Sequence, residues 1–361
     1  MIAHKDHFHG SDLEKIEKIY GIKKEEIISF SANVNPLGIS PKLKNTIASH
    51  IDAISSYPDP DYTALRERIA AYCHTQSENI IVGNGTTELI SLFIQITEPK
   101  KALILGPTYS EYEREITLEG GRASYYPLHS ANDFALDISD FTERLRDSVD
   151  LLVLCNPNNP TSTCINVKDM RRILDVCKEH DIYVMVDETY IEFVEDYDSV
   201  TSVPLTSYYN NIIVLRGSSK FFAAPGLRLG YAVTGNRDLI SHIHQYKNPW
   251  MINSLAEIAG CIMFSDTEYI AKTKELIKKE RTFMYNALKA SDRYTPYFPH
   301  ANFMLIKIED ETLNSSILFD KCIREKMMIR DCSTFPFLDD KFIRVCFMNH
   351  ADNERLLCVL L

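Results

Sequence analysis

The chain has 361 residues, of which 45% are hydrophobic and 25% charged, with a formal net charge of −11 and a sequence pI near 5.5. This length predicts one large and one smaller domain, and the ordinary globular composition leaves no stretch for a disordered tail. Because an acidic protein repels phosphate backbones and anionic lipids, and no Lys/Arg-rich run is present, neither nucleic acid nor a membrane is an expected partner.

The nine cysteines form no CxxC pair, and the first residues show no secretory leader. This usage argues against a disulfide framework or a zinc site and predicts reduced thiols in a cytoplasmic protein without a bound metal. No apolar run reaches the roughly 18 residues that a membrane span needs. In so acidic a chain, a small anionic substrate would have to be held by a few well-placed arginines.

Short apolar runs recur through the first two thirds of the chain, between helix-period segments such as 62–73 and 167–180. This alternation predicts βαβ units and a mostly parallel sheet of about seven strands. In such a sheet ligands bind at the carboxyl ends of the strands, so the residues that close each run are the first candidates for a site. The expected strands cover residues 79–82, 102–105, 123–126, 151–155, 183–186, 212–215 and 229–233.

After residue 248 the pattern changes to a long helical stretch at 254–288, followed by strand-like segments at 302–308 and 342–347. We expect this C-terminal third to join the N-terminal segment in a second lobe. The predicted fold class is therefore α/β, with a mostly parallel seven-stranded sheet in the larger part and a smaller α+β part. The expected domains are 45–248 for the large one, and 1–44 with 249–361 for the small one.

Two strand ends lead into tight turns. The strand at 79–82 runs into Gly83-Asn84-Gly85-Thr86-Thr87-Glu88, where glycines free the backbone and hydroxyls open the next helix. This segment fits an anion cradle at a helix N-terminus, although a simple capped turn fits it as well. The strand at 151–155 ends in Asn156-Pro157-Asn158-Asn159-Pro160-Thr161, where prolines fix the path of the backbone. Taken alone, that turn is also explained as a stiff loop.

Two further strand ends place ionisable groups. Asp187 follows the apolar run at 183–186, where it is either a buried carboxylate or a helix cap. Lys220 follows the run at 212–215, amid small hydroxyl residues. A lysine beside a buried strand loses hydration, which lowers its pKa from about 10.4 and favours the neutral amine that Schiff-base chemistry needs. Lys220 is therefore a candidate nucleophile.

Six segments occur in a fixed order along the chain: GNGTTE, PTYSEY, NPNNPT, DETY, SSK and PGLRLGY. Together they resemble the fold-type I pyridoxal-phosphate-dependent aminotransferase family, and the match covers essentially the whole chain. The resemblance implies an enzyme that binds pyridoxal 5′-phosphate in its large domain. It also implies a homodimer whose active sites lie at the subunit interface.

The resemblance implies roles for the residues around the cofactor ring, with Lys220, Asp187 and Tyr190 as the catalytic set. Lys220 would form the Schiff base and later move the proton at the substrate's α-carbon. Asp187 would keep the pyridine nitrogen protonated, so that the ring accepts electrons from the breaking bond. Asn159 and Tyr190 would hydrogen-bond the phenolic oxygen, and Tyr109 would stack on the ring.

A second implied set binds the cofactor phosphate. Two positions nearby depart from the family pattern. Gly217 stands where a hydroxyl residue is usual, so that one phosphate hydrogen bond is missing or is replaced by Ser218. Ser162 stands where a glycine commonly follows Asn-Pro-Thr, which would slightly change that turn. The implied phosphate ligands are Gly85, Thr86, Thr87, Ser218, Ser219 and Arg228, with Tyr57 of the partner subunit.

Within the family the resemblance extends to two branches with phosphorylated substrates, histidinol-phosphate aminotransferase and the threonine-phosphate decarboxylase of cobalamin biosynthesis. Three parts of the sequence favour the decarboxylase branch: His9-Gly10 with 30–38, the segment 220–228, and the segment 329–335. Arg344 would bind the substrate α-carboxylate bidentately. The other implied substrate ligands are Arg330, Asn33 and His9.

The sequence leaves two reactions open, because they differ in which bond at the α-carbon lies perpendicular to the cofactor ring. A carboxylate held in the ring plane leaves the C–H bond exposed and gives transamination. Amine transfer from histidinol phosphate, which has no carboxylate to lose, to 2-oxoglutarate is the alternative reaction of this kind. A carboxylate turned out of the plane is lost, which would convert L-threonine O-3-phosphate to (R)-1-aminopropan-2-yl phosphate. A non-catalytic module that senses the cofactor is disfavoured by the intact Lys220 and Asp187 and by the lack of an appended helix-turn-helix region.

Overall fold

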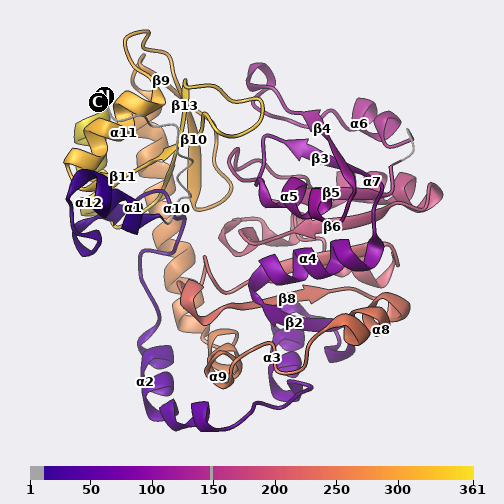
Figure 1. Ribbon diagram of the computed structural model, residues 1–361. Helices are drawn as coiled ribbons and strands as arrows, with labels where there is room; N and C mark the ends of the chain where they lie inside the picture. Colours follow the sequence, from indigo (N-terminus) through magenta and orange to yellow (C-terminus); the bar gives the residue numbers. More distant parts are fainter. Residues whose placement is uncertain (1–11, 147–148) are drawn as a thin grey trace.

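The computed structural model describes residues 12–146 and 149–361. Within them, a seven-stranded sheet has the order β2-β8-β7-β6-β5-β3-β4, at the right in Figure 1. Its strands are parallel except β8, which pairs antiparallel with β2 and β7. The predicted fold class is confirmed. The strands are β2 (Ile80–Asn84), β3 (Lys101–Gly106), β4 (Arg122–Pro127), β5 (Leu151–Cys155), β6 (Tyr183–Asp187), β7 (Ile212–Gly217) and β8 (Leu229–Val233).

This sheet is covered on both faces. Alternate residues of each central strand point to opposite sides, and both sets pack in hydrophobic clusters. In β5, Leu151 and Val153 pack in one hydrophobic cluster, and Leu152 and Leu154 pack in another. Burial on both faces explains why the strands read as continuous apolar runs in the sequence. The covering helices are α4 (Gly85–Thr97), α5 (Glu111–Leu118) and α8 (Arg237–Tyr246) on one face, and α3 (Thr63–Cys73), α6 (Ile138–Arg144) and α7 (Val167–Glu179) on the other.

A four-stranded antiparallel sheet, of order β12-β13-β10-β9, lies at the upper left in Figure 1. The N-terminal segment joins this part, because β1 (Ile28–Ser29) pairs in parallel with β11 (Met327–Met328). We call this part the small lobe and the part around the seven-stranded sheet the large lobe. Other elements of the small lobe are β9 (Tyr294–Pro296), β10 (Phe303–Ile308), β12 (Arg330–Asp331), β13 (Phe342–Cys346), α1 (Leu13–Tyr20), α11 (Ser315–Arg324) and α12 (His350–Leu360).

Helix α10 (Thr267–Lys289) runs along the small lobe toward the large lobe, as Figure 1 shows. Helix α9 (Ser254–Met263) precedes it and packs against α2 (Pro41–Ser49), α3 and β8. Part of the chain after residue 248 therefore lies against elements of the large lobe. The domain limits expected from the sequence remain predictions.

Asparagine caps fix where several helices begin. At α7, α8, α9, α11 and α12 the side-chain oxygen of an asparagine accepts a hydrogen bond from the backbone amide three residues further on. Each cap satisfies one amide that the helix itself leaves unpaired. The caps are Asn166, Asn236, Asn253, Asn314 and Asn349.

Candidate active site

Lys220 lies just beyond β7, and its amine meets the N-terminal segment. Its Nζ donates a hydrogen bond to the carbonyl oxygen of Ala32 at 2.7 Å, and its own carbonyl oxygen accepts one from the Asn35 amide at 3.0 Å. Burial, assisted by the positive charges of Arg344 and Arg228, lowers the pKa of Lys220 to about 8. Near neutral pH part of this amine is therefore uncharged, which is the form that attacks a carbonyl group.

Asp187 closes β6 with a buried carboxylate. Its Oδ1 accepts hydrogen bonds from the backbone amide and the hydroxyl of Thr189, at 2.9 and 2.6 Å, and its Oδ2 accepts one from the Tyr112 hydroxyl at 2.7 Å. Burial raises the pKa of Asp187, and these three donated hydrogen bonds oppose that rise by stabilising the charged form. The carboxylate is thus held from two sides at the carboxyl edge of the sheet.

Sequence reasoning does not single out Tyr112, although it contacts Asp187. Tyr112 is fully buried in α5, and its ring meets that of Tyr109 edge to face, with the centroids 5.6 Å apart. Burial raises the pKa of Tyr109 to about 12, so its hydroxyl is neutral. The sequence signal that could have found it is the spacing in PTYSEY, where Tyr112 comes three residues after Tyr109 and so lies about one helical turn further on, near the same site.

Arg344 projects from β13 and connects the two lobes. It donates hydrogen bonds to Asn159 Oδ1, in the turn after β5, and to the Ser31 carbonyl oxygen at 2.6 Å. Its guanidinium carbon lies 5.3 Å from the centre of the Phe303 ring. The residue is only 5% exposed, and its Nε has no hydrogen-bond partner among the described residues. A buried, partly unsatisfied guanidinium of this kind suits an anionic ligand.

Arg330, in β12, stands directly opposite Arg344 in the antiparallel pair β12–β13. It donates a hydrogen bond to the Thr334 hydroxyl at 2.9 Å and lies over the Phe335 ring. Burial lowers the pKa of Arg330, and the nearby charge of Arg344 acts in the same direction. Like charges directly opposite each other destabilise a sheet, so this pair favours a bound anion that would offset the repulsion.

Asn33 and Tyr190 contact each other beside Phe303 of β10. Asn33 Nδ2 donates a hydrogen bond to the Tyr190 hydroxyl at 3.3 Å, and the Tyr190 ring packs edge to face on Phe303, with the centroids 4.8 Å apart. Asn302 fixes the Asn33 backbone by donating to its carbonyl oxygen at 2.9 Å. Asn33 Oδ1 is buried without a hydrogen-bond partner among the described residues, so it can still accept one from a ligand.

A second part of the site, at the N-terminus of α4, has the form of an anion-binding site, which we call the glycine cradle. Gly85 has a φ of +77°, and a Cβ atom there would lie 2.4 Å from Arg228 Nη2. Gly230 similarly lets β8 approach the Gly85–Thr86 backbone, since its Cβ would come within 2.6 Å of the Thr86 nitrogen. The guanidinium of Arg228 thus faces free helix amides, an arrangement that binds phosphate well.

The predicted phosphate ligands near the lysine differ in what they contact. The Ser218 hydroxyl is buried and donates to the Leu229 carbonyl oxygen at 3.1 Å, and a Cβ on Gly217 would meet Thr86 Cγ2 at 3.2 Å. A side chain at position 217 would therefore be in tight contact with Thr86. Ser219, Thr86 and Thr87 are partly exposed.

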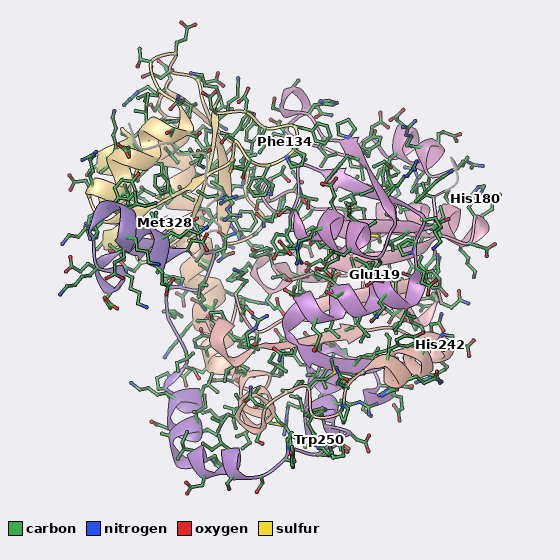
Figure 2. All side chains as sticks on the ribbon, in the orientation of Figure 1. Glu119, Phe134, His180, His242, Trp250 and Met328 are labelled. Carbon is green, nitrogen blue, oxygen red and sulfur yellow. The ribbon has the colours of Figure 1, made fainter. Side chains whose placement is uncertain are left out.

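Tyr57 and His9 are not placed with the other predicted residues. Tyr57 is 81% exposed and packs on Trp250, with the ring centroids 4.8 Å apart. Figure 2 shows Trp250 at the lower edge of the large lobe, whereas Met328 lies within the small lobe. His9 falls outside the described residues.

The donor set fits pyridoxal phosphate. The glycine cradle beneath Arg228 suits its phosphate, the anionic Asp187 suits a protonated pyridine nitrogen, and the Lys220 amine suits its aldehyde. Among the described residues, no group of three His, Cys, Asp or Glu side chains could hold a metal ion. No helix in the same part of the chain has both the length and the apolar composition to cross a bilayer.

Residues 25–360 match the family of class I and II aminotransferases. The threonine-phosphate decarboxylase of Salmonella typhimurium is 32% identical over 352 residues, which cover 98% of this chain and 95% of the relative. A protein of Caldanaerobacter subterraneus subsp. tengcongensis, provisionally named a threonine-phosphate decarboxylase, is 37% identical over 326 residues, or 90% of this chain and 87% of the relative.

Solved structures are similar as well. The histidinol-phosphate aminotransferase of Clostridium acetobutylicum is 33% identical, with a TM-score of 0.85 over 92% of this chain and 97% of that one. The histidinol-phosphate aminotransferase of Sinorhizobium meliloti, solved with pyridoxal-5′-phosphate, has a TM-score of 0.84 at 20% identity, over 96% and 92% of the two chains. At that identity the likeness shows the fold alone. The similar proteins thus carry the names of two reactions.

Proposed function

The chain belongs to the class I and II aminotransferase family, and from this membership we propose that it decarboxylates L-threonine O-3-phosphate to (R)-1-aminopropan-2-yl phosphate in cobalamin biosynthesis. It is an enzyme, and its cofactor is pyridoxal phosphate. Two relatives named for this decarboxylation, at 32% and 37% identity, support the proposal. We also propose that it acts in the cytoplasm.

The observation that carries the proposal is the facing pair of arginines, the partly buried Arg330 and the buried Arg344. L-Threonine O-phosphate has two anionic groups, a carboxylate and a phosphate, whereas histidinol phosphate has a phosphate and no carboxylate. One arginine for each group would remove the repulsion between the two guanidinium groups. In this proposal Arg344 holds the carboxylate, Arg330 the phosphate, and Asn33 donates or accepts a further hydrogen bond.

The proposed roles of the chain's own groups follow from their contacts. When bound, pyridoxal phosphate supplies a sink for the electron pair of a bond that breaks at the substrate α-carbon. Asp187 would hold a proton at the pyridine nitrogen, because its three hydrogen-bond donors favour its charged form and oppose the effect of burial. Arg344 would hold the carboxylate in the orientation in which its own bond to the α-carbon breaks. After carbon dioxide leaves, the Lys220 ammonium would deliver the proton that replaces the carboxylate on the α-carbon.

We propose that the remaining predicted residues bind the cofactor. Gly85, Thr86 and Arg228 would hold its phosphate at the start of α4, with Thr87 and Ser219 close by. Ser218 would support the segment that carries Lys220, through its hydrogen bond to the Leu229 carbonyl oxygen. On the ring, Tyr109 would stack, and Tyr190 and Asn159 would contact the phenolic oxygen.

We further propose a homodimer. Exposed apolar side chains gather between residues 37 and 57, namely Leu37, Ile39, Ile51, Ile54 and Tyr57, and Trp250 packs on the last of them. Such a surface is typical of a contact with another chain. In the dimer Tyr57 of the partner subunit would reach the cofactor phosphate. A catalytically competent monomer in analytical ultracentrifugation would contradict this proposal.

A second candidate is histidinol-phosphate aminotransferase, which the 33% identical structure with a TM-score of 0.85 favours. The same arginines could hold the phosphate of histidinol phosphate and later the carboxylates of 2-oxoglutarate. The deciding experiment incubates the holoenzyme with each substrate and follows carbon dioxide release and amine transfer in parallel, with Lys220→Ala as the blank. Carbon dioxide from threonine phosphate supports the proposal. Amine transfer from histidinol phosphate without carbon dioxide would replace it by the second candidate.

A further inference from the structure

Ser162 has a backbone conformation that serine rarely adopts. It follows the Asn-Pro-Thr turn after β5 with a φ of +61°, is fully buried, and donates its backbone amide to the Asn158 carbonyl oxygen at 2.7 Å. A left-handed φ is readily adopted by glycine and strains most other residues. The serine must therefore gain contacts that glycine could not make.

Those contacts come from the small lobe. The Ser162 hydroxyl oxygen accepts hydrogen bonds from two successive backbone amides, those of His300 at 3.0 Å and Ala301 at 2.8 Å. The Ser162 carbonyl oxygen accepts a further one from the His300 amide at 3.2 Å. With glycine at this position the Ala301 amide would lose its acceptor, while the His300 amide would keep one.

The loop 300–302, which Ser162 holds, leads directly into β10, where Phe303 lies beside the residues proposed to bind the substrate. Phe303, two residues after Ala301, packs against both Tyr190 and the Arg344 guanidinium. Arg281 supports the loop from the other side, because its Nη2 donates to the carbonyl oxygens of His300 and Ala301, each at 3.0 Å. The loop is thus fixed between α10 and the turn of the large lobe.

The same turn also holds Arg344 itself, through the side-chain oxygen of Asn159. Ser162 and Asn159 therefore tie one turn of the large lobe to two neighbouring strands of the small lobe, β10 and β13. These ties fix where Arg344 lies relative to Lys220. That relation sets the angle at which a substrate carboxylate would be presented to the cofactor.

We propose that Ser162 is a positioning residue that clasps the 300–303 loop to the large lobe and so holds Arg344 in the orientation that favours loss of the carboxylate over amine transfer. The clasp acts through backbone amides and takes no part in bond making. Its effect on the reaction rests on the proposed decarboxylation, whereas the clasp itself does not depend on the substrate.

The test compares Ser162→Gly, which removes the hydroxyl and the backbone strain, with Ser162→Ala, which removes the hydroxyl alone. Asp181→Gly is the matched control, since Asp181 also has a positive φ, of 55°, but lies in an exposed turn. The first readout is hydrogen exchange of the substrate-free holoenzyme in peptides that span 298–303. Loss of one hydrogen bond should speed exchange there by roughly three- to tenfold in Ser162→Gly and leave the control unchanged.

The second readout is the ratio of carbon dioxide release to amine transfer from L-threonine O-phosphate. In Ser162→Gly we expect kcat for decarboxylation to fall on the order of tenfold, with KM changed less, and the share of amine transfer to rise. Unchanged exchange in both serine variants would overturn the clasp. Faster exchange with an unchanged ratio would overturn its effect on the reaction. A wild-type enzyme that releases no carbon dioxide would reject the proposed function, and the exchange data would still decide on the clasp.

Discussion

At one end of the candidate site, α4 begins at Gly85 beneath Arg228, and Asp187 and Lys220 follow neighbouring strands of a single sheet. At the other end, which we call the substrate end, Arg344 donates hydrogen bonds to the Ser31 carbonyl oxygen of the N-terminal segment and to the Asn159 side chain of the large lobe. The cofactor end therefore lies mostly in the large lobe, where only the Lys220 amine meets the N-terminal segment at Ala32, and the substrate end is assembled from three distant parts of the chain. Relatives share the cofactor chemistry, which fits a cofactor end built on one sheet. They differ in the reaction, which fits a substrate end whose geometry depends on contacts between the lobes.

The largest effect is expected at the cofactor end, where Lys220→Ala should abolish turnover and leave the fold intact. The holoenzyme should be yellow, and borohydride should fix the cofactor on Lys220, as peptide mapping would show. Lys247 is the matched control, because burial lowers its pKa to about 8 as well, yet it lies against the Tyr62 ring. A label on Lys247 would contradict the assignment, and Lys247→Ala should retain activity.

Asp187→Asn should keep the cofactor and lose roughly a hundred- to a thousandfold in kcat, because an uncharged partner no longer holds the pyridine nitrogen protonated. The matched control is Asp175→Asn, since Asp175, an exposed residue of α7, also accepts a hydrogen bond from a tyrosine hydroxyl, that of Tyr209 at 2.7 Å. Cofactor content, spectrum and steady-state kinetics are measured for both variants. Full activity of Asp187→Asn would exclude the proposed role.

At the substrate end, Arg330→Ala should weaken the binding of the phosphorylated substrate without changing cofactor content. Losing one charge-assisted contact of this partly buried arginine should cost on the order of 1.5 to 3 kcal/mol, which would be seen in kcat/KM. Arg324→Ala is the control, because Arg324 is an exposed residue of α11 paired with Asp320. Equal kcat/KM in the two variants would contradict a substrate-binding role for Arg330.

How far the sequence predicts the site differs between the two ends. The central strands of the large lobe could be predicted because their burial on both faces leaves unbroken apolar runs. Asp187 directly follows such a run, and Lys220 comes five residues after another. The acceptors around Arg344 could not, because a backbone carbonyl such as that of Ser31 has no side-chain signature. The backbone amides of His300 and Ala301, which donate hydrogen bonds to Ser162, could not be predicted either. Only the packing of the two lobes brings these amides next to the serine.

The smallest expected effect is a pH dependence of stability in the cofactor-free protein, which tests whether the cofactor end is formed without any ligand. The folded pKa of Lys220 is about 8, against about 10.4 for an unfolded lysine. Between these values the unfolded chain binds more protons than the folded one, so the contribution of Lys220 to stability rises with pH across that window.

The free energy of unfolding of the cofactor-free wild type should therefore rise relative to that of Lys220→Met from pH 8 to pH 10, by at most about 1.4 kcal/mol per pH unit, and the difference should be flat below pH 7. Urea unfolding of both proteins at each pH measures this difference. Lys247 is present in both proteins, so its own titration cancels. A difference that does not change with pH would mean that the amine of Lys220 is hydrated before the cofactor binds, and that the cofactor end, like the substrate end, is completed only by its ligand.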